Sequence, residues 1–176
     1  MSNPPLSCRR AGPEDAAQIA TVHVSSWRSA YINVVPFDLL AGLSVEVRKA
    51  GWEQILSSSD PRSATFVIEK EDKVVGFAHI GRAARLDPIL NFGEIYSLYL
   101  LEEVWGQGGG SRLMQEVLLF MKWADYAKLQ LWVLDGNDRA NRFYERCGFK
   151  RDASEQGEKL EQLGDATIRE IRYIYE

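Results

Sequence analysis

A glycine-rich segment, Trp105–Arg112, has the residue types and spacing of a phosphate-binding loop. It follows a run that reads as a β-strand, Glu94–Leu101, and precedes a run that reads as an amphipathic helix, Leu113–Lys122. Glycines leave backbone N–H groups uncovered by side chains, and the helix N-terminus adds a partial positive charge there. The segment is therefore suited to hold a phosphate or pyrophosphate. The alternative is a flexible surface turn without a ligand.

Two other phosphate-binding patterns do not fit this segment. A P-loop requires a lysine after its last glycine, and here Ser111 and Arg112 follow instead. The dinucleotide-binding pattern requires Gly-x-Gly-x-x-Gly. Its third glycine is replaced by Ser111 when counted from Gly106 and by Leu113 when counted from Gly108. An enzyme of nucleotide phosphates is therefore only a distant alternative.

A second segment begins at Asn137 and has the features of a capped helix that leads into a strand. Asn137 suits the N-cap position. Ala140, Phe143 and Tyr144 follow at offsets that place them on one helical face. Gly148 suits the left-handed conformation that ends many helices. The alternative is an Asn-capped helix with an aromatic core face and no ligand.

The two segments together resemble the signature of the GNAT family of N-acetyltransferases. Gly108 and Gly110 match the acetyl-CoA loop of that family, which runs Arg/Gln-x-x-Gly-x-Gly/Ala. The second segment matches the family pattern at each of its positions. Trp105 departs from the loop pattern, because the family has Arg or Gln there. The departure removes one charge near a phosphate and leaves the loop amides intact.

The resemblance implies acetyl-CoA as the cosubstrate, with no metal. The backbone of Leu98–Leu100 would pair with the pantetheine arm like an added strand. Loop amides would bind the pyrophosphate, and Asn137 would bond to the pantetheine or order the acetyl end. The expected cofactor-binding residues are Leu98, Tyr99, Leu100, Gln107, Gly108, Gly109, Gly110, Ser111, Asn137 and Tyr144.

Tyr144 is the catalytic residue that the resemblance implies most directly. In the family, this tyrosine protonates the departing thiolate. A phenol has a pKa of about 10 and a thiol about 8.5, so full proton transfer is slightly uphill. The hydroxyl can still donate a hydrogen bond as charge builds on sulfur. The alternative is a buried tyrosine that only packs.

Glu94 is the candidate general base, because it opens the central strand. A lysine-like amine has a pKa of about 10.4 and a free glutamate about 4.3, so direct proton transfer would be uphill by about 8 kcal/mol. Glu94 therefore needs a raised pKa, a water relay, or an acceptor whose own pKa is lowered. A solvated carboxylate at the end of a strand is the alternative.

The phrase Val22–Tyr31 looks like one subgroup of the same family, in which the first helices form a wall of the acceptor pocket. Trp27 and Tyr31 are therefore candidate substrate-binding residues. Both also fit the helical spacing of core aromatics, which is the alternative.

Strands and helices must bring the two segments together. Strands are expected at Leu6–Arg10, Thr65–Lys70, Val74–Ile80, Glu94–Leu101, Lys128–Leu134, Phe149–Ala153 and Thr167–Tyr175. Helices are expected after Gly12, at Phe37–Leu40, at Ser44–Leu56, at Leu113–Lys122 and from Asn137. This order resembles the complete acetyltransferase fold. We expect an α/β chain of the α+β type, with a mixed, mostly antiparallel sheet and helices on both faces, as one N-acetyltransferase domain spanning residues 1–176.

Composition narrows the class of protein further. The 176 residues carry a net charge of −4 without a Lys/Arg-rich stripe, so nucleic acid is not an expected partner. No apolar run reaches membrane-spanning length and no signal peptide is evident, so we expect a cytoplasmic protein without a membrane partner. The two cysteines, Cys8 and Cys147, form no CxxC pair, and this leaves a disulfide framework or a zinc site unsupported.

The sequence thus predicts acetyl transfer from acetyl-CoA to a primary amine of a small molecule or peptide. The rival from another class is an acyl-CoA-sensing module that binds the cofactor without catalysis, and the presence of Asn137 and Tyr144 disfavours it. The identity of the acceptor cannot be read from the sequence. The resemblance also allows a homodimer formed through the last strands.

Overall fold

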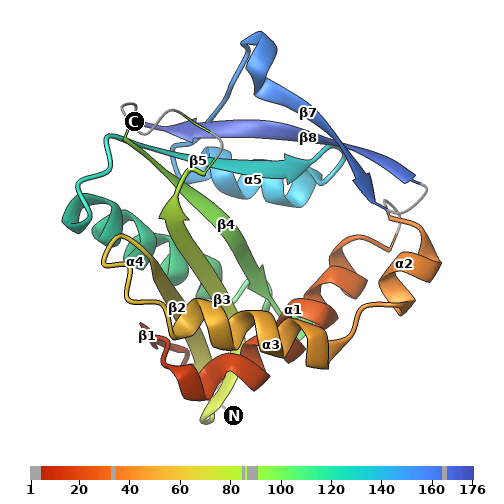
Figure 1. The fold of residues 1–176 in the computed structure, drawn as a ribbon, viewed down its shortest axis with the longest axis vertical. Helices are drawn as coiled ribbons and strands as arrows, with labels where there is room; N and C mark the ends of the chain where they lie inside the picture. The colour runs from red at the N-terminus through yellow and green to blue at the C-terminus, as the bar shows by residue number, and fades with distance from the viewer. Residues whose placement is uncertain (1–4, 33–34, 85, 87–90, 164–165) are drawn as a thin grey trace.

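The computed structural model describes residues 5–32, 35–84, 86, 91–163 and 166–176. Figure 1 shows a twisted sheet with helices packed on its two faces. The strands are β1 (Ser7–Arg10), β2 (Ala64–Lys70), β3 (Lys73–Arg82), β4 (Phe92–Leu100), β5 (Lys128–Leu134), β6 (Lys150–Arg151), β7 (Glu158–Leu163) and β8 (Ala166–Tyr175). The α-helices are α1 (Ala16–Ala30), α2 (Phe37–Ala41), α3 (Val45–Leu56), α4 (Gly109–Trp123) and α5 (Asp138–Arg146).

The sheet is mixed and mostly antiparallel, which confirms the expected fold class. Its strand order is β1-β2-β3-β4-β5-β8-β6, and β7 pairs with β8 outside this path. Among the described strands, β4 and β5 are the parallel neighbours, and every other pair is antiparallel. The parallel connection is made through α4, as a parallel crossover requires.

Among the described residues, three apolar clusters hold the helices on the sheet. The smallest joins Leu40 of α2 to Leu134 of β5 and Ile168 of β8. Of the two larger clusters, one joins α4 and α5 to the sheet, and the other joins α1 and α3 to its opposite face. β3 contributes to both, with Val75 and Ala78 on the α4 side and Val74 and Phe77 on the α1 side. A strand covered on both faces needs apolar residues on both faces, which explains why VVGFAHI shows no alternation of polar and apolar residues.

β4 and β5 separate partway along their length. Their pairing ends at Ile95 and Leu131, although β4 continues beside β3 to Leu100 and β5 continues beside β8. Tyr96 is an extra residue in the β3–β4 ladder, because His79 and Ile80 lie opposite Ser97 and Ile95. Such a bulge bends its strand. We call the opening between the two strands beyond Ile95 the fork.

Most element positions agree with the sequence analysis, but the strand expected at Phe149–Ala153 is only the two-residue β6, and two further corrections are needed. The helix after the glycine loop begins at Gly109 instead of Leu113, so two of the loop glycines belong to its first turn. The second correction is β7, Glu158–Leu163, which the sequence analysis missed. Its sequence EKLEQL lacks β-branched and aromatic residues, which are the usual signal of a strand. Within the described ranges, no helix combines the length and apolar character needed to cross a membrane.

Candidate active site

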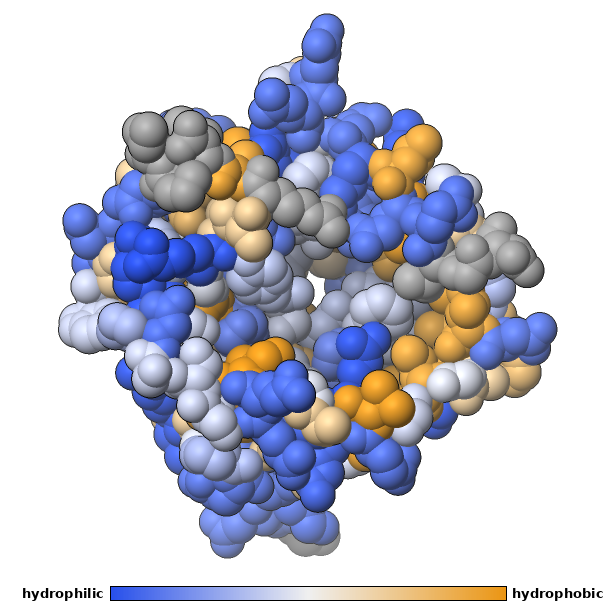
Figure 2. Space-filling model, in the orientation of Figure 1, coloured by the Kyte–Doolittle hydropathy of each residue, from blue (hydrophilic) through white to orange (hydrophobic). Residues whose placement is uncertain are grey.

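A cavity of about 390 Å³ occupies the fork and extends to the glycine loop. Figure 2 shows a hollow near the centre of the displayed face, between α1, β4 and β5 as they lie in Figure 1. The cavity brings together predicted site residues that are far apart in the sequence. Those that line it are Tyr31, Leu98, Tyr99, Leu100, Gly108, Gly109, Gly110, Ser111, Asn137 and Tyr144. Glu94, Gln107 and Trp27 do not line it.

The glycine loop turns the chain from β4 into α4. Gly106 and Gly108 have φ angles of 74° and 84°, a left-handed conformation that favours glycine. A Cβ on Gly109 would lie 2.7 Å from Leu100 Cδ2, and one on Gly110 would lie 3.2 Å from the Phe143 ring. Glycine at these two positions therefore lets the start of α4 pack closely against β4 and α5.

The start of α4 presents backbone amides that have no intrahelical partner. The first amide that bonds back is that of Arg112, whose N lies 3.1 Å from Gly108 O. The amides of Gly109, Gly110 and Ser111 precede it, and these residues line the cavity. An anion would find hydrogen-bond donors and the positive end of the helix dipole there. The predicted amide of Gln107 is already used, since its backbone N donates to Val104 O at 3.4 Å. Its side-chain Nε2 donates to Glu103 O at 2.8 Å.

The second segment forms α5 as the sequence predicts. Asn137 is its N-cap, and its Oδ1 accepts a hydrogen bond from Ala140 N at 3.2 Å. Gly148 follows the helix with a φ of 93°. Tyr144 is 9 % exposed and packs in the core on the α4 side while also lining the cavity. Burial, with a smaller contribution from Tyr99, raises the pKa of the Tyr144 hydroxyl, so it remains a proton donor at neutral pH.

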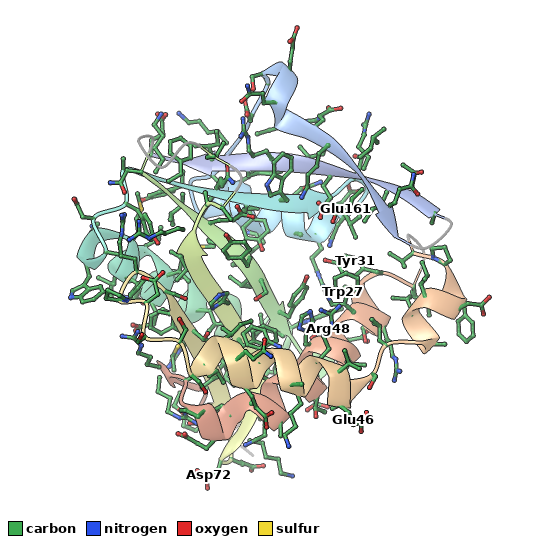
Figure 3. All side chains as sticks on the ribbon, viewed as in Figure 1. Trp27, Tyr31, Glu46, Arg48, Asp72 and Glu161 are labelled. Atoms are coloured by element: carbon green, nitrogen blue, oxygen red, sulfur yellow. The ribbon has the colours of Figure 1, made fainter. Side chains whose placement is uncertain are left out.

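Tyr31, the residue that follows α1, forms part of the cavity wall and packs against Trp27 of α1. Tyr31 is buried and lines the cavity, and its ring centroid lies 5.1 Å from that of Trp27 in an edge-to-face arrangement. Figure 3 shows Trp27 and Tyr31 side by side at the central opening, with Arg48 of α3 below them. Burial, followed by the influence of Tyr99, raises the pKa of Tyr31. The hydroxyl groups of Tyr31 and Tyr144 are therefore both uncharged near neutral pH.

Behind this wall, His23 is packed among aromatic rings. Its ring centroid lies 5.3 Å from that of Tyr99 and 5.6 Å from that of Phe77. Trp52 Nε1 donates to His23 Nδ1 at 3.2 Å, so Nδ1 carries no proton. Burial, together with Arg48, lowers the pKa of His23 to about 3. His23 is therefore a neutral packing residue at physiological pH.

Glu94 lies at the closed end of the fork. It faces Gln130 across the β4–β5 pair, and Gln130 Nε2 donates to Glu94 Oε2 at 2.8 Å. Gln130 is 1 % exposed, which fixes the position of this contact. The cavity lining begins at the next residue, Ile95. Glu94 thus precedes the first lining residue of β4 without forming part of the cavity wall, and its catalytic role stays a prediction.

Sequence reasoning did not single out several residues of the lining, notably Arg139, Arg146 and Trp132. An arginine on a polar helix is usually a solvated residue, so nothing in its type marks it as functional. One signal was available: Arg139 and Arg146 are seven positions apart in α5, which places them on one helical face. Trp132 lies on β5, where only the separation of the strands exposes it to the cavity.

Comparison with known proteins relates this geometry to a family. Residues 31–149 match the model of the acetyltransferase (GNAT) family. An uncharacterized N-acetyltransferase of Bacillus subtilis, YuaI, is 31% identical over 164 residues, which cover 90% of this chain and 91% of that protein. An uncharacterized N-acetyltransferase of Archaeoglobus fulgidus is 37% identical over 150 residues, which cover 85% of this chain and 96% of that protein.

Solved structures share the fold at lower sequence identity. The PaiA N-acetyltransferase of Thermoplasma acidophilum, solved in complex with coenzyme A, superposes with a TM-score of 0.75 at 21% identity, covering 96% of this chain and 99% of that one. YncA of Salmonella typhimurium, a putative acetyltransferase solved with acetyl-CoA, has a TM-score of 0.70 at 16% identity, covering 97% and 92%. These structures show the fold, whereas the family match over residues 31–149 and the curated relatives show that the chain belongs to the acetyltransferase (GNAT) family and is an N-acetyltransferase.

Proposed function

We propose that this protein transfers an acetyl group from acetyl-CoA to a primary amine of a small molecule or peptide. One observation carries the proposal: a single cavity connects the free amides at the start of α4 with the fork and with the buried hydroxyl of Tyr144. The relatives solved with coenzyme A or acetyl-CoA support this choice of donor.

The edge of β4 beyond the fork offers a place for the pantetheine arm. Leu101 N donates to Val75 O, and alternate residues of a strand direct their N–H and C=O groups to opposite sides. Leu98 and Leu100 therefore direct theirs away from β3, toward the side that β5 has left. Leu100 O already accepts hydrogen bonds from Trp105 Nε1 at 2.9 Å and Ser26 Oγ at 3.2 Å. We accordingly assign the pairing with pantetheine mainly to Leu98.

The reaction forms one bond and breaks one. The nitrogen of the free amine attacks the thioester carbonyl carbon, the new C–N bond replaces the C–S bond, and the CoA thiolate leaves. Tyr144 donates a hydrogen bond to the sulfur as its negative charge grows. Full transfer of the phenol proton to a thiolate is uphill by about 2 kcal/mol at ordinary pKa values. Burial raises the pKa of Tyr144 and enlarges that difference, so we assign the hydroxyl a stabilising hydrogen bond.

The amine must lose a proton before or during the attack. Glu94 is beside the cavity and not in its wall, so we propose that it accepts this proton through a water molecule. Tyr31 and Trp132 would flank the acceptor, because both line the part of the cavity nearest the α1 wall and β5. Trp27 would act by supporting Tyr31, since the two rings are in contact.

The test is release of free thiol from acetyl-CoA in the presence of a panel of primary amines, including polyamines, amino acids and peptides with free N-termini. We expect amine-dependent release with at least one member and a much slower rate in Tyr144→Phe. Tight binding of acetyl-CoA without turnover by any amine would instead support the acyl-CoA-sensing alternative.

A further inference from the structure

Two arginines of α5 line the cavity beside the glycine loop. Arg139 and Arg146 both line it, whereas Arg142, which lies between them in the sequence, does not. Seven residues correspond to two helical turns, or about 10 Å along the axis. Phe143 lies on the same face and approaches Gly110, whose Cβ would be 3.2 Å from the ring. This stripe of α5 therefore faces the start of α4.

The two arginines dominate the electrostatics of the cavity. The chain carries a net charge of −4, yet among the described residues that line the cavity the charged side chains are Arg139 and Arg146. Neither guanidinium has a hydrogen bond or ion pair with another described residue. Arg9, Arg151 and Arg172, by contrast, are paired with carboxylates. Two cations without a hydrogen-bonded carboxylate thus line the same cavity as the free amides of α4.

Arg139 is held in place by Trp105. Its guanidinium carbon lies 3.0 Å from the centre of the Trp105 ring, and Trp105 Nε1 donates to Leu100 O at 2.9 Å. Stacking on an aromatic face orients a guanidinium and leaves its N–H groups free to bind an anion. Partial burial lowers the pKa of Arg139 without removing its charge. By holding the Arg139 guanidinium, Trp105 thus places a positive charge near the position where the family loop has Arg or Gln.

We propose that Arg139 and Arg146 bind different phosphate groups of CoA: Arg139 binds the pyrophosphate, and Arg146 binds the 3′-phosphate of the ribose. Arg139 is anchored within the glycine loop, where the pyrophosphate meets the α4 amides. Arg146 lies two helical turns from Arg139, so we expect it to bind a second anionic group. Besides the pyrophosphate, the anionic group that CoA carries is the 3′-phosphate of the ribose. The inference rests on the proposed donor and adds a selectivity for CoA thioesters that bear the 3′-phosphate.

The test is calorimetric titration of CoA and of 3′-dephospho-CoA into the protein and its variants. We expect the parent to bind CoA at least tenfold more tightly than 3′-dephospho-CoA. Arg146→Ala should weaken CoA binding about tenfold, leave 3′-dephospho-CoA binding unchanged and so abolish the preference. Arg139→Ala should weaken both ligands about equally and keep the preference. Arg142→Ala, on the same helix but outside the cavity, is the matched control and should change neither.

The outcomes separate the inference from the proposed function. If Arg146→Ala keeps the preference for CoA, or if the parent has none, the assignment of Arg146 is wrong while CoA binding itself stands. If the parent binds neither ligand, the proposed donor and this inference both fail. Trp105→Leu tests the anchoring of Arg139: it should weaken both ligands, and adding Arg139→Ala should cause less than the product of the two separate losses. Fully multiplicative losses would contradict the anchoring.

Discussion

The two walls of the cavity differ in how they are built. The wall that faces the proposed donor consists of the glycine loop, the start of α4 and α5, and it carries free amides and cations. The other wall combines Tyr31 of α1 with Tyr96 and Ser97 of β4 and Trp132 of β5, and it is uncharged. The first wall comes from two continuous segments, whereas the second joins residues about a hundred positions apart. The donor wall therefore has a sequence signature and the acceptor wall has none.

The largest expected effect concerns the donor wall. Gly110→Val places a branched side chain where a Cβ alone would lie 3.2 Å from the Phe143 ring, so α4 and α5 must move apart. We expect the variant to lose the rise in melting temperature that acetyl-CoA gives the parent, since a ligand stabilises only the state that binds it. Gly51→Val is the matched control, because a Cβ there has no neighbour within 4 Å. Equal thermal shifts in Gly110→Val and the parent would refute the loop assignment.

Tyr144→Phe tests the chemistry where the two walls meet. The variant keeps the ring and removes the hydroxyl, so kcat should fall about 10²-fold, the lower end of the range for general acids. The Kd for acetyl-CoA should change little, because the thioester sulfur carries almost no charge before the reaction. Steady-state rates of both proteins from pH 6 to 10 provide the measurement.

The pH dependence of that defect follows from the protonation state of Tyr144. Burial raises the pKa of Tyr144, so the parent keeps its phenol proton throughout this range. The hydroxyl therefore donates the same hydrogen bond to the departing sulfur at each pH, and the ratio of the two kcat values should stay constant from pH 6 to 10. Equal kcat values at every pH, with acetyl transfer as the slow step, would leave Tyr144 as a packing residue.

Glu94→Gln should have a smaller effect. Because Glu94 is outside the cavity wall and is proposed to act through water, we expect kcat/KM to fall about tenfold, below the usual range for a direct general base. The loss should be confined to pH values below the acceptor pKa, where a proton must be removed. The replacement retains an oxygen that can accept the bond from Gln130 Nε2. A pH–rate profile that overlays that of the parent would exclude Glu94 as the base.

The smallest predicted effect concerns stability behind the acceptor wall. Burial lowers the pKa of His23 to about 3 in the folded protein, against about 6.5 when unfolded. The unfolded state therefore takes up a proton first as pH falls, and stability present above pH 6.5 is lost progressively below it. The contribution lost at pH 5 is about 2 kcal/mol. Denaturant unfolding should show a shallower loss between pH 7 and 5 for His23→Gln than for the parent, and identical slopes would contradict this.

The difference between the donor wall and the acceptor wall also explains which features could be predicted from the sequence. The bounds of β5 and the cap of α5 agree with expectation because the local pattern determines them. α4 begins early because packing of Gly109 against Leu100 overrides the poor helix propensity of glycine. The position of Glu94 depends on its pairing with Gln130, 36 residues away, for which the sequence carries no signal. Arg139 and Arg146 were likewise visible only once α5 was packed against the loop.

The most direct test of the account follows the acetyl group itself. The parent protein is incubated with acetyl-CoA labelled in the acetyl carbon and with the most active amine of the panel, and both free thiol and labelled amide are quantified. The account predicts one labelled amide for each thiol released. Thiol release with the label recovered as acetate would show hydrolysis without transfer, and binding without either product would show a sensing module; either result would contradict the proposed acetyltransferase activity.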